Sequence, residues 1–305
     1  MTHGHAHTAR TAAGRHWRRL LLVLLVGLVI LVAQVVGGLL SGSLALLADA
    51  GHMLTDVAGL ALALFAVALA QRPPTLTRTW GLARAEVLAA GANALVLIGV
   101  GVWVLVEAVR RVAEPPEVAG GTMLVFGAVG LAGNAVGVWL LASVQRESLN
   151  LRGAFLEVLS DAVASLGVLV AAVLVRYTSW DSADAVVAAG IAVFILPRAF
   201  RLLRDAVQVL LESTPRDVDL AEVRRHILGI PRVLDVHDLH ASTVTSGLPV
   251  LSAHVVIDAG CFHDGQAPQV LDRLQHCLAA DFDVTHSTFQ LEPDGHLDHE
   301  RSHHR

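Results

Sequence analysis

Ser43-Leu-Ala-Leu-Leu-Ala-Asp-Ala-Gly-His-Met-Leu-Thr-Asp56 is an apolar segment that nevertheless carries a histidine and two aspartates. His52 and Asp56 are four residues apart, so on a helix both side chains leave the same face, one turn apart. A pair with the same spacing, Glu157 and Asp161, lies in a second apolar segment further along the chain. Two such helices packed face to face would offer one imidazole and three carboxylates to a single ion, and these N and O ligands suit a transition metal.

Ionisable residues are rare in such surroundings, because a charge at the centre of a membrane span costs roughly 2.5–3.5 kcal/mol on insertion scales. The two pairs are therefore predicted to form a functional metal site. Asp49 lies three residues before His52 on the same helical face, and we expect it to support the ligands rather than to bind the ion itself. The alternatives are a structural polar pair between helices for His52 and Asp56, and a proton relay without metal for Glu157 and Asp161.

The composition is that of a membrane protein. Of the 305 residues, 54% are hydrophobic and only 16% are charged, and the mean hydropathy is +0.60. A bilayer core of roughly 30 Å requires about 20 apolar residues in a helix. We therefore predict an α-helical membrane protein whose residues 17–210 form six transmembrane helices: Trp17–Leu40, Leu44–Ala70, Glu86–Val109, Thr122–Ser143, Ala154–Val175 and Ala183–Phe200.

The basic residues, all of them arginine, predict the orientation of these helices. They gather before the first predicted helix, between the second and third, between the fourth and fifth, and after the sixth. Loops rich in basic residues stay on the cytoplasmic side. Both termini are therefore expected in the cytoplasm of a multi-pass protein of the inner (plasma) membrane. A net charge of −5, without a basic stripe that includes aromatic residues, argues against a nucleic-acid partner.

Residues 211–293 have the composition of a soluble domain and alternate between helix and strand patterns. Asp219 is a plausible N-cap for the first helix, and the two cysteines form no CxxC motif, which agrees with a reducing cytosol. The predicted elements give an αββαβ order, a small α+β open-faced sandwich. They are a helix over Leu220–Leu228, strands over Val233–Thr245 and Pro249–Ile257, a helix over Pro268–Ala280 and a strand over Val284–Leu291.

Several histidines lie on the predicted strands of this domain. His237, His254 and His286 are our candidate ligands for a regulatory metal, whereas His240 would point away from His237 in a regular strand. Strand histidines that bind no metal are an equally good explanation. The predicted cytosolic tails, 1–16 and 294–305, are also rich in histidine and could bind metal weakly or be dispensable. Their histidines are His3, His5, His7, His296, His299, His303 and His304.

With these motifs in hand, the chain resembles the cation diffusion facilitator family, in its zinc-type branch, from about Trp17 to Pro293. The resemblance rests on Gly37–Asp56, on Arg78–Ala90 with Asn93, and on Leu149–Ala154. In the soluble part it rests on Val236–His240, Ser252–Val256 and Phe289–Glu292. It implies a proton-coupled exporter of divalent metal that works as a homodimer, with a cytosolic αββαβ domain that dimerises and can bind extra metal.

Within the resemblance, His52, Asp56 and Asp161 match the family's ligand positions, whereas Glu157 stands where the zinc-type branch commonly has histidine. Zinc is the expected substrate, with cobalt or cadmium as co-substrates, because one nitrogen ligand disfavours magnesium and calcium. The three carboxylates leave a manganese- or iron-selective exporter open. His52 is the expected proton-coupling residue, since the unperturbed pKa of histidine, about 6.5, lies near physiological pH.

Two other classes of function compete with transport. A metal sensor or scaffold in the membrane would bind ions without moving them. An intramembrane metal-dependent hydrolase would need a general base beside the metal, and the HExxH motif of zinc proteases is absent from the sequence. We therefore expect a transporter rather than an enzyme.

Overall fold

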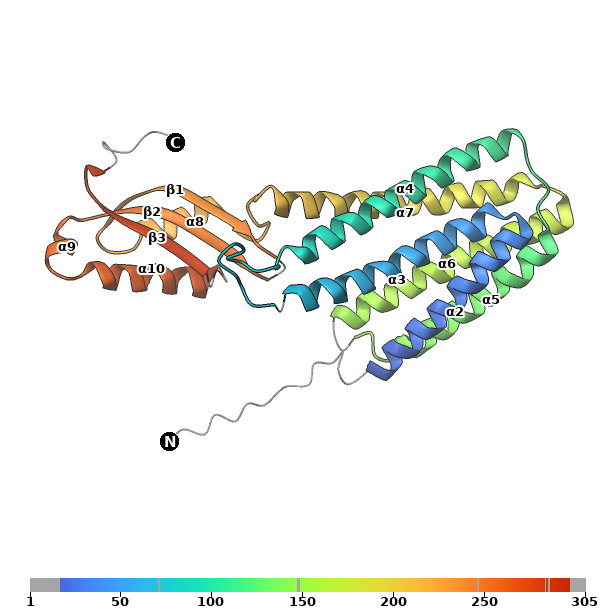
Figure 1. Ribbon diagram of the computed structural model, residues 1–305, viewed down its shortest axis with the longest axis horizontal. Helices are drawn as coiled ribbons and strands as arrows, with labels where there is room; N and C mark the ends of the chain where they lie inside the picture. The colour runs from blue at the N-terminus through green and yellow to red at the C-terminus, as the bar shows by residue number, and fades with distance from the viewer. Residues whose placement is uncertain are drawn as a thin grey trace. The chain divides into compact units, whose positions relative to one another are not determined.

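The computed structural model describes residues 17–70, 72–146, 149–245, 247–282, 284 and 286–296. Its contacts divide the chain into two compact units, Met1–Ala61 with Ala92–Leu202, and Leu62–Gly91 with Leu203–Arg305. Helices dominate the first unit and the second contains a sheet (Figure 1). The histidines predicted to bind metal in the tails lie outside the described residues, except His296.

Six long helices confirm the predicted helical membrane domain. They are α2 (Trp17–Ser41), α3 (Leu44–Ala70), α4 (Ala85–Ala113), α5 (Gly120–Ala142), α6 (Leu149–Thr178) and α7 (Ser182–Leu210). In the described part of the chain, five of them, all but α3, meet a test of length and apolarity for crossing a membrane. The sixth, α3, has 27 residues and carries Asp49, His52 and Asp56. Helices α6 and α7 exceed their predicted limits, because an apolar run marks the membrane core rather than the ends of a helix.

The N-terminus of α3 is fixed by a side chain from a distant helix. Gly42 turns the chain between α2 and α3 with a φ of 72°, a conformation that glycine adopts without steric cost. Asp184 of α7 then accepts hydrogen bonds from the Ser43 hydroxyl (2.5 Å), the Leu44 amide (2.6 Å) and the Ala45 amide (3.1 Å). The carboxylate thus satisfies amides that the first turn of a helix leaves without partners.

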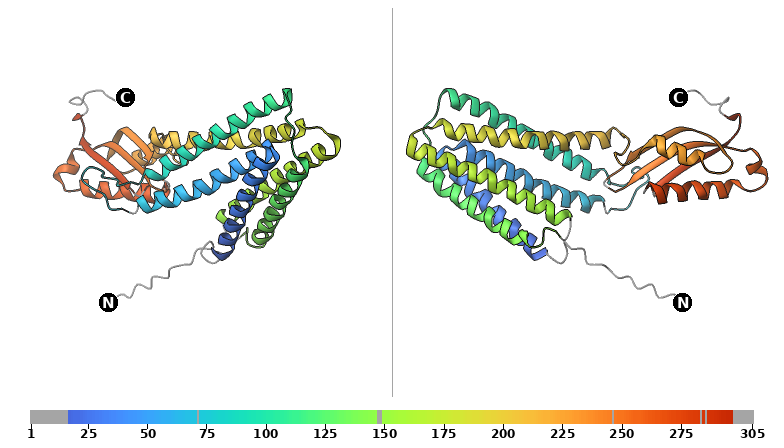
Figure 2. Two further views of the ribbon diagram at one scale, coloured as in Figure 1. Left: turned by 45° about the vertical axis from the view of Figure 1, so that its right-hand side comes forward. Right: turned by 180° about the vertical axis from the view of Figure 1, so that it is seen from behind.

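Helices α2, α5 and α6 lie side by side in the first unit, as the two views of Figure 2 show. Glycines permit the close approach of α2 to α5. A Cβ atom added to Gly37 would lie 2.4 Å from Phe126, and one added to Gly133 would lie 2.6 Å from Ile30. Small residues at such contacts are a common means of packing helices in membranes.

The second unit contains the predicted αββαβ elements and one short helix that was not predicted. Strands β1 (Val233–Thr243) and β2 (Pro249–Ile257) are antiparallel, and β3 (His286–Pro293) adds to β2 in parallel, giving the order β1-β2-β3. Helices α8 (Leu220–Leu228) and α10 (Ala267–Asp281) contact each other, and α9 (Gly260–His263) is the additional helix. Three strand limits differ from prediction, since β1 ends at Thr243 and β3 begins at His286 and ends at Pro293.

The core of this sheet domain explains its pattern of residues. Val223 and Ile227 of α8, Leu274 and Leu278 of α10 and Val255 of β2 are all fully buried together. Asp219 caps α8 as predicted, accepting from the amides of Ala221 and Glu222. The two cysteines of the chain are both here. Cys261 is buried in the core, whereas Cys277 on α10 is partly exposed, with its thiol 3.7 Å from Asp281.

Candidate metal sites

Three of the predicted ligands converge inside the helical unit. Nε2 of His52 lies 3.5 Å from Oδ2 of Asp56, which follows one turn later on α3, and 3.6 Å from Oδ1 of Asp161 on α6. One potential ligand atom from each of the three residues lies within 4.8 Å of the others. His52 and Asp161 are each only 7% exposed. The i, i+4 spacing therefore places His52 and Asp56 on one face, as predicted, and α6 brings the third donor to them.

These buried donor atoms have lone pairs that the protein does not satisfy. Nδ1 of His52 and Oδ1 of Asp161 are buried without a hydrogen-bond partner. The contacts of 3.5–3.6 Å between His52 and the carboxylates exceed the usual length of a hydrogen bond. Buried polar atoms are normally paired, and such exceptions call for an explanation. A bound cation would account for the free oxygen of Asp161, because Nε2 of His52 and the carboxylates of Asp56 and Asp161 lie close enough to share one ion.

Glu157 shares the α6 face of Asp161 but is held differently. Its two carboxylate oxygens face the guanidinium of Arg198 on α7, with Nη1 2.8 Å from Oε1 and Nη2 donating to Oε2 at 2.9 Å. Glu157 also lies within hydrogen-bonding range of Asp56. Glu157 therefore lies at the margin of the three-residue cluster. It is paired with Arg198, an arginine that was not among the predicted site residues.

Asp49 lies one turn before His52 on α3 and belongs to a buried hydrogen-bond network. Its carboxylate is fully buried and accepts hydrogen bonds from Nε2 of Gln34 on α2 and from the Ser165 hydroxyl on α6, the latter at 3.1 Å. Ser165 in turn accepts from Nδ2 of Asn134 on α5 at 3.1 Å. This network joins four helices one turn from His52 and Asp161, and such outer contacts commonly orient metal ligands.

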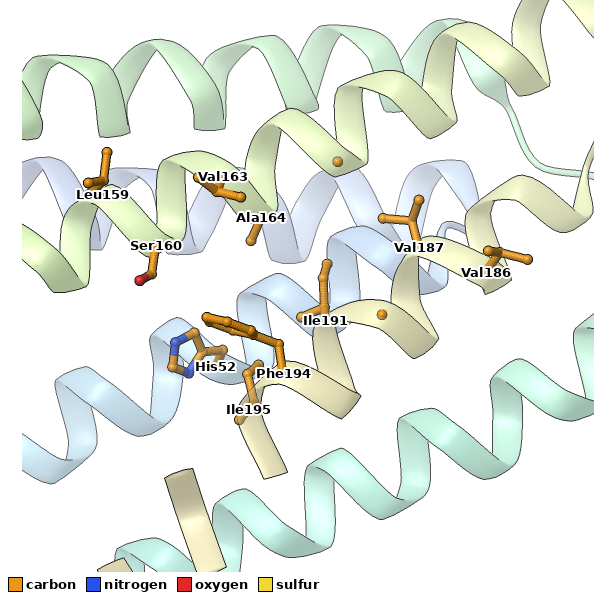
Figure 3. A pocket seen from close by; sticks show the side chains of 12 residues that line it. His52, Leu159, Ser160, Val163, Ala164, Val186, Val187, Ile191, Phe194 and Ile195 are labelled. Carbon is orange, nitrogen blue, oxygen red and sulfur yellow. The ribbon is translucent and has the colours of Figure 1, made fainter. Parts of the chain in front are cut away.

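An apolar cavity of about 590 Å³ opens beside His52, between α6 and α7. Figure 3 shows the imidazole next to Phe194 and Ile195 of α7, with Leu159 and Val163 of α6 among the other lining residues. Apolar walls lower the local dielectric constant, so attraction between a cation and the nearby carboxylates is stronger here than in water.

A second cluster of potential ligands lies on the sheet of the other unit. His254 on β2 is paired in register with His237 on β1, and their rings are 5.1 Å apart. The fully buried Glu292 on β3 lies 2.8 Å from Nδ1 of His254 and 3.5 Å from Nε2 of His237. One atom from each residue can reach a common ion, since these atoms lie within 4.8 Å of one another.

The predicted third ligand of this cluster, His286, is not part of it. The parallel register pairs His286 with Val250, four residues before His254, so it is offset by about 13 Å along the strand. His286 is exposed, and its ring makes an edge contact with Trp80 at 4.8 Å. Glu292 takes its place. Residues two apart in a strand share a face, so the sequence could have placed Glu292 on the same face as Gln290. It could not give the register of β3, which decides that Gln290 lies beside His254.

Two descriptions of known protein families match the chain. The "Cation efflux transmembrane domain" covers residues 20–211, and the "Cation efflux protein, cytoplasmic domain" covers residues 215–294. Together they span both units and both clusters of potential ligands.

Curated proteins with names of the same kind are similar over nearly the whole chain. The identity is 44% to the metal cation efflux system protein CzcD of Cupriavidus metallidurans, over 95% of this chain and 90% of that protein. It is 39% to the zinc transporter ZitB of Escherichia coli, over 100% of both chains. It is 35% to a cadmium, cobalt and zinc/H(+)-K(+) antiporter of Bacillus subtilis, over 87% of this chain and 86% of that protein.

These matches agree with the helical membrane domain and the three-stranded α+β domain. The family consists of metal-ion transporters rather than enzymes. The chain belongs to the cation efflux family, the cation diffusion facilitators, and contains both its transmembrane and its cytoplasmic domain.

Proposed function

We propose that this protein exports a divalent transition metal from the cytoplasm in exchange for protons, with zinc as its main substrate and cobalt or cadmium as co-substrates. The observation that carries the proposal is the convergence of His52, Asp56 and Asp161 at one buried point. The names of the related proteins, which include zinc, cadmium and cobalt, support the choice of metal. Glu157 completes the set of four residues assigned to the transport site.

The chemistry of these groups accounts for exchange. A histidine nitrogen and carboxylates bind metal only when deprotonated, so metal binding releases protons and protonation releases metal. His52 is suited to this coupling because histidine changes its charge near physiological pH. Alternating exposure of the site to the two sides of the membrane would then convert inward proton flow into outward metal flow without a nucleotide.

The surroundings of the transport site complete the proposal. The excess of arginine in alternate loops supports an inner-membrane protein with both termini in the cytoplasm. The cytoplasmic domain supports a homodimer, since the family that it matches is named for a dimer of zinc transporters. His237, His254 and Glu292 are proposed to bind a regulatory metal in this domain, with Glu292 in the place first expected for His286.

Flux in proteoliposomes that contain only this protein tests the function. Metal uptake into proteoliposomes whose cytoplasmic face points outward should rise when the interior is more acidic than the outside. The uptake should collapse when an ionophore dissipates this proton gradient. A panel of zinc, cobalt, cadmium, manganese and ferrous iron decides the substrate, since three carboxylates also suit manganese and iron. Binding without flux of any metal would favour a sensor or scaffold, and flux indifferent to pH between about 5.5 and 8 would contradict coupling through His52.

A further inference from the structure

Arg198 is placed to act on the transport site through Glu157. The two side chains meet in a two-point ion pair, with Nη1 2.8 Å from Oε1 and Nη2 2.9 Å from Oε2. Planar, doubly hydrogen-bonded pairs of this kind are among the strongest that proteins form. The side chain of Glu157 is 31% exposed and that of Arg198 is 54% exposed, so the surroundings screen part of this attraction.

The charge of Arg198 also reaches the other carboxylates of the site. It interacts electrostatically with Asp56 and Asp161 as well as with Glu157. In the part of the chain that the structure describes, no other arginine forms an ion pair with His52, Asp56, Glu157 or Asp161. Arg198 is therefore the basic side chain that sets the charge of this site.

The charges of the four ligands and Arg198 explain why an arginine suits this position. When His52 is neutral and Asp56, Glu157 and Asp161 are ionised for metal binding, the donors carry three negative charges. Arg198 cancels one of them. The remaining two match the charge of a divalent ion, so the four ligands, Arg198 and the ion together carry no net charge, and this lowers the cost of charge in an apolar interior. The nearby carboxylate of Asp49 is held separately by hydrogen bonds from Gln34 and Ser165.

We infer that Arg198 sets the metal affinity of the transport site, as an internal cation that competes with the metal for Glu157. This inference rests on the proposed function. The competition lowers affinity for the metal and so favours its release, and a transported ion must bind weakly enough to leave. Arginine suits this role because it keeps its charge at every physiological pH, so it stays a constant counter-ion while protons and metal exchange around it.

Pairing by charge makes a specific prediction for substitutions. R198Q leaves three uncompensated negative charges, so zinc should bind about tenfold tighter or more and the maximal flux should fall as release slows. E157Q leaves one, so binding should weaken about tenfold. The double variant R198Q/E157Q again carries two negative charges, so its affinity should return to within about threefold of the starting protein. R198K keeps the charge but cannot make both hydrogen bonds to Glu157, so its zinc affinity should lie between those of the starting protein and R198Q.

The experiment measures equilibrium zinc binding and proteoliposome flux for the full chain carrying H237A/H254A, so that the cytoplasmic cluster adds no signal. R201Q is the matched control, because Arg201 lies one turn further along α7 and donates to the carbonyl of Pro197. Opposite changes in affinity and maximal flux for R198Q, with recovery in the double variant, support the inference. Unchanged affinity in R198Q, or a double variant that binds zinc as weakly as E157Q alone, overturns it.

Two further results keep the outcome clear. If R198Q fails to fold, R198K and the double variant test the inference instead. R198K keeps the positive charge, so a zinc affinity in R198K below that of the starting protein contradicts an electrostatic role. If the wild-type protein, with His237 and His254 intact, moves no metal, the proposed function fails, whereas flux with unchanged zinc affinity in R198Q defeats only the role of Arg198.

Discussion

At the scale of single residues, His52 is the group on which the transport site depends most. Its ring lies between Asp56 and Asp161 and supplies the only nitrogen among the four assigned ligands. We expect H52A to weaken zinc binding by about 100-fold or more, because even outer-contact substitutions cost 10–100-fold. The protein should remain folded, and metal flux should be lost. H240A, at an exposed histidine of the cytoplasmic domain, is the control. Wild-type flux in H52A would remove His52 from the site.

A second prediction at this scale concerns Glu157 and selectivity. E157H adds a nitrogen ligand but leaves Arg198 without its carboxylate, so we expect the single variant to bind zinc poorly. The double variant E157H/R198Q restores two net negative charges. Its ratio of zinc to manganese flux should exceed that of the starting protein, because zinc favours imidazole more than manganese does. A ratio that stays unchanged in the double variant would show that residue 157 does not contact the ion.

At the scale of elements, the cap supplied by Asp184 holds the helix that carries His52. Three donors at the start of α3 share this one buried carboxylate. We expect D184A to destabilise the protein by about 1–3 kcal/mol, since buried donors lose their acceptor. D184N should lose less, because an amide oxygen still accepts. Thermal unfolding in detergent measures both, with D181A as a nearby control. If D184A melts at the same temperature as the starting protein, the cap from Asp184 does not stabilise α3.

The same elements show how far the sequence predicts the structure. Apolar length gave the six helices, and alternation gave the αββαβ order. The i, i+4 rule placed His52 with Asp56. The pairing of Arg198 with Glu157, the cap from Asp184 and the replacement of His286 by Glu292 were missed. Each depends on how distant segments pack or on a strand register, and local pattern carries neither.

At the scale of the whole molecule, the two clusters of ligands predict a protein with two kinds of metal site. The purified full-length protein should bind about two zinc ions per chain if each cluster of donors holds one. H237A/H254A should remove one of them and leave the membrane site's affinity unchanged. Equilibrium dialysis with metal analysis measures the stoichiometry, and E292Q should reproduce the loss. A stoichiometry that does not fall in either variant would exclude the cytoplasmic cluster as a metal site.

The placement of the cysteines makes the protein convenient for spectroscopy. The sequence contains only Cys261 and Cys277, and Cys261 is buried, so a thiol reagent should label one position per chain. Burial and the adjacent negative charge of Asp281 raise the pKa of the Cys277 thiol. Less of it is thiolate at neutral pH, so maleimide should react slowly, faster as pH rises, and faster in D281N. In a homodimer, one spin label per chain gives one distance between protomers. Because the membrane helices lack cysteine, single cysteines placed along α3 or α7 after C277S could then report movement of the transport helices directly.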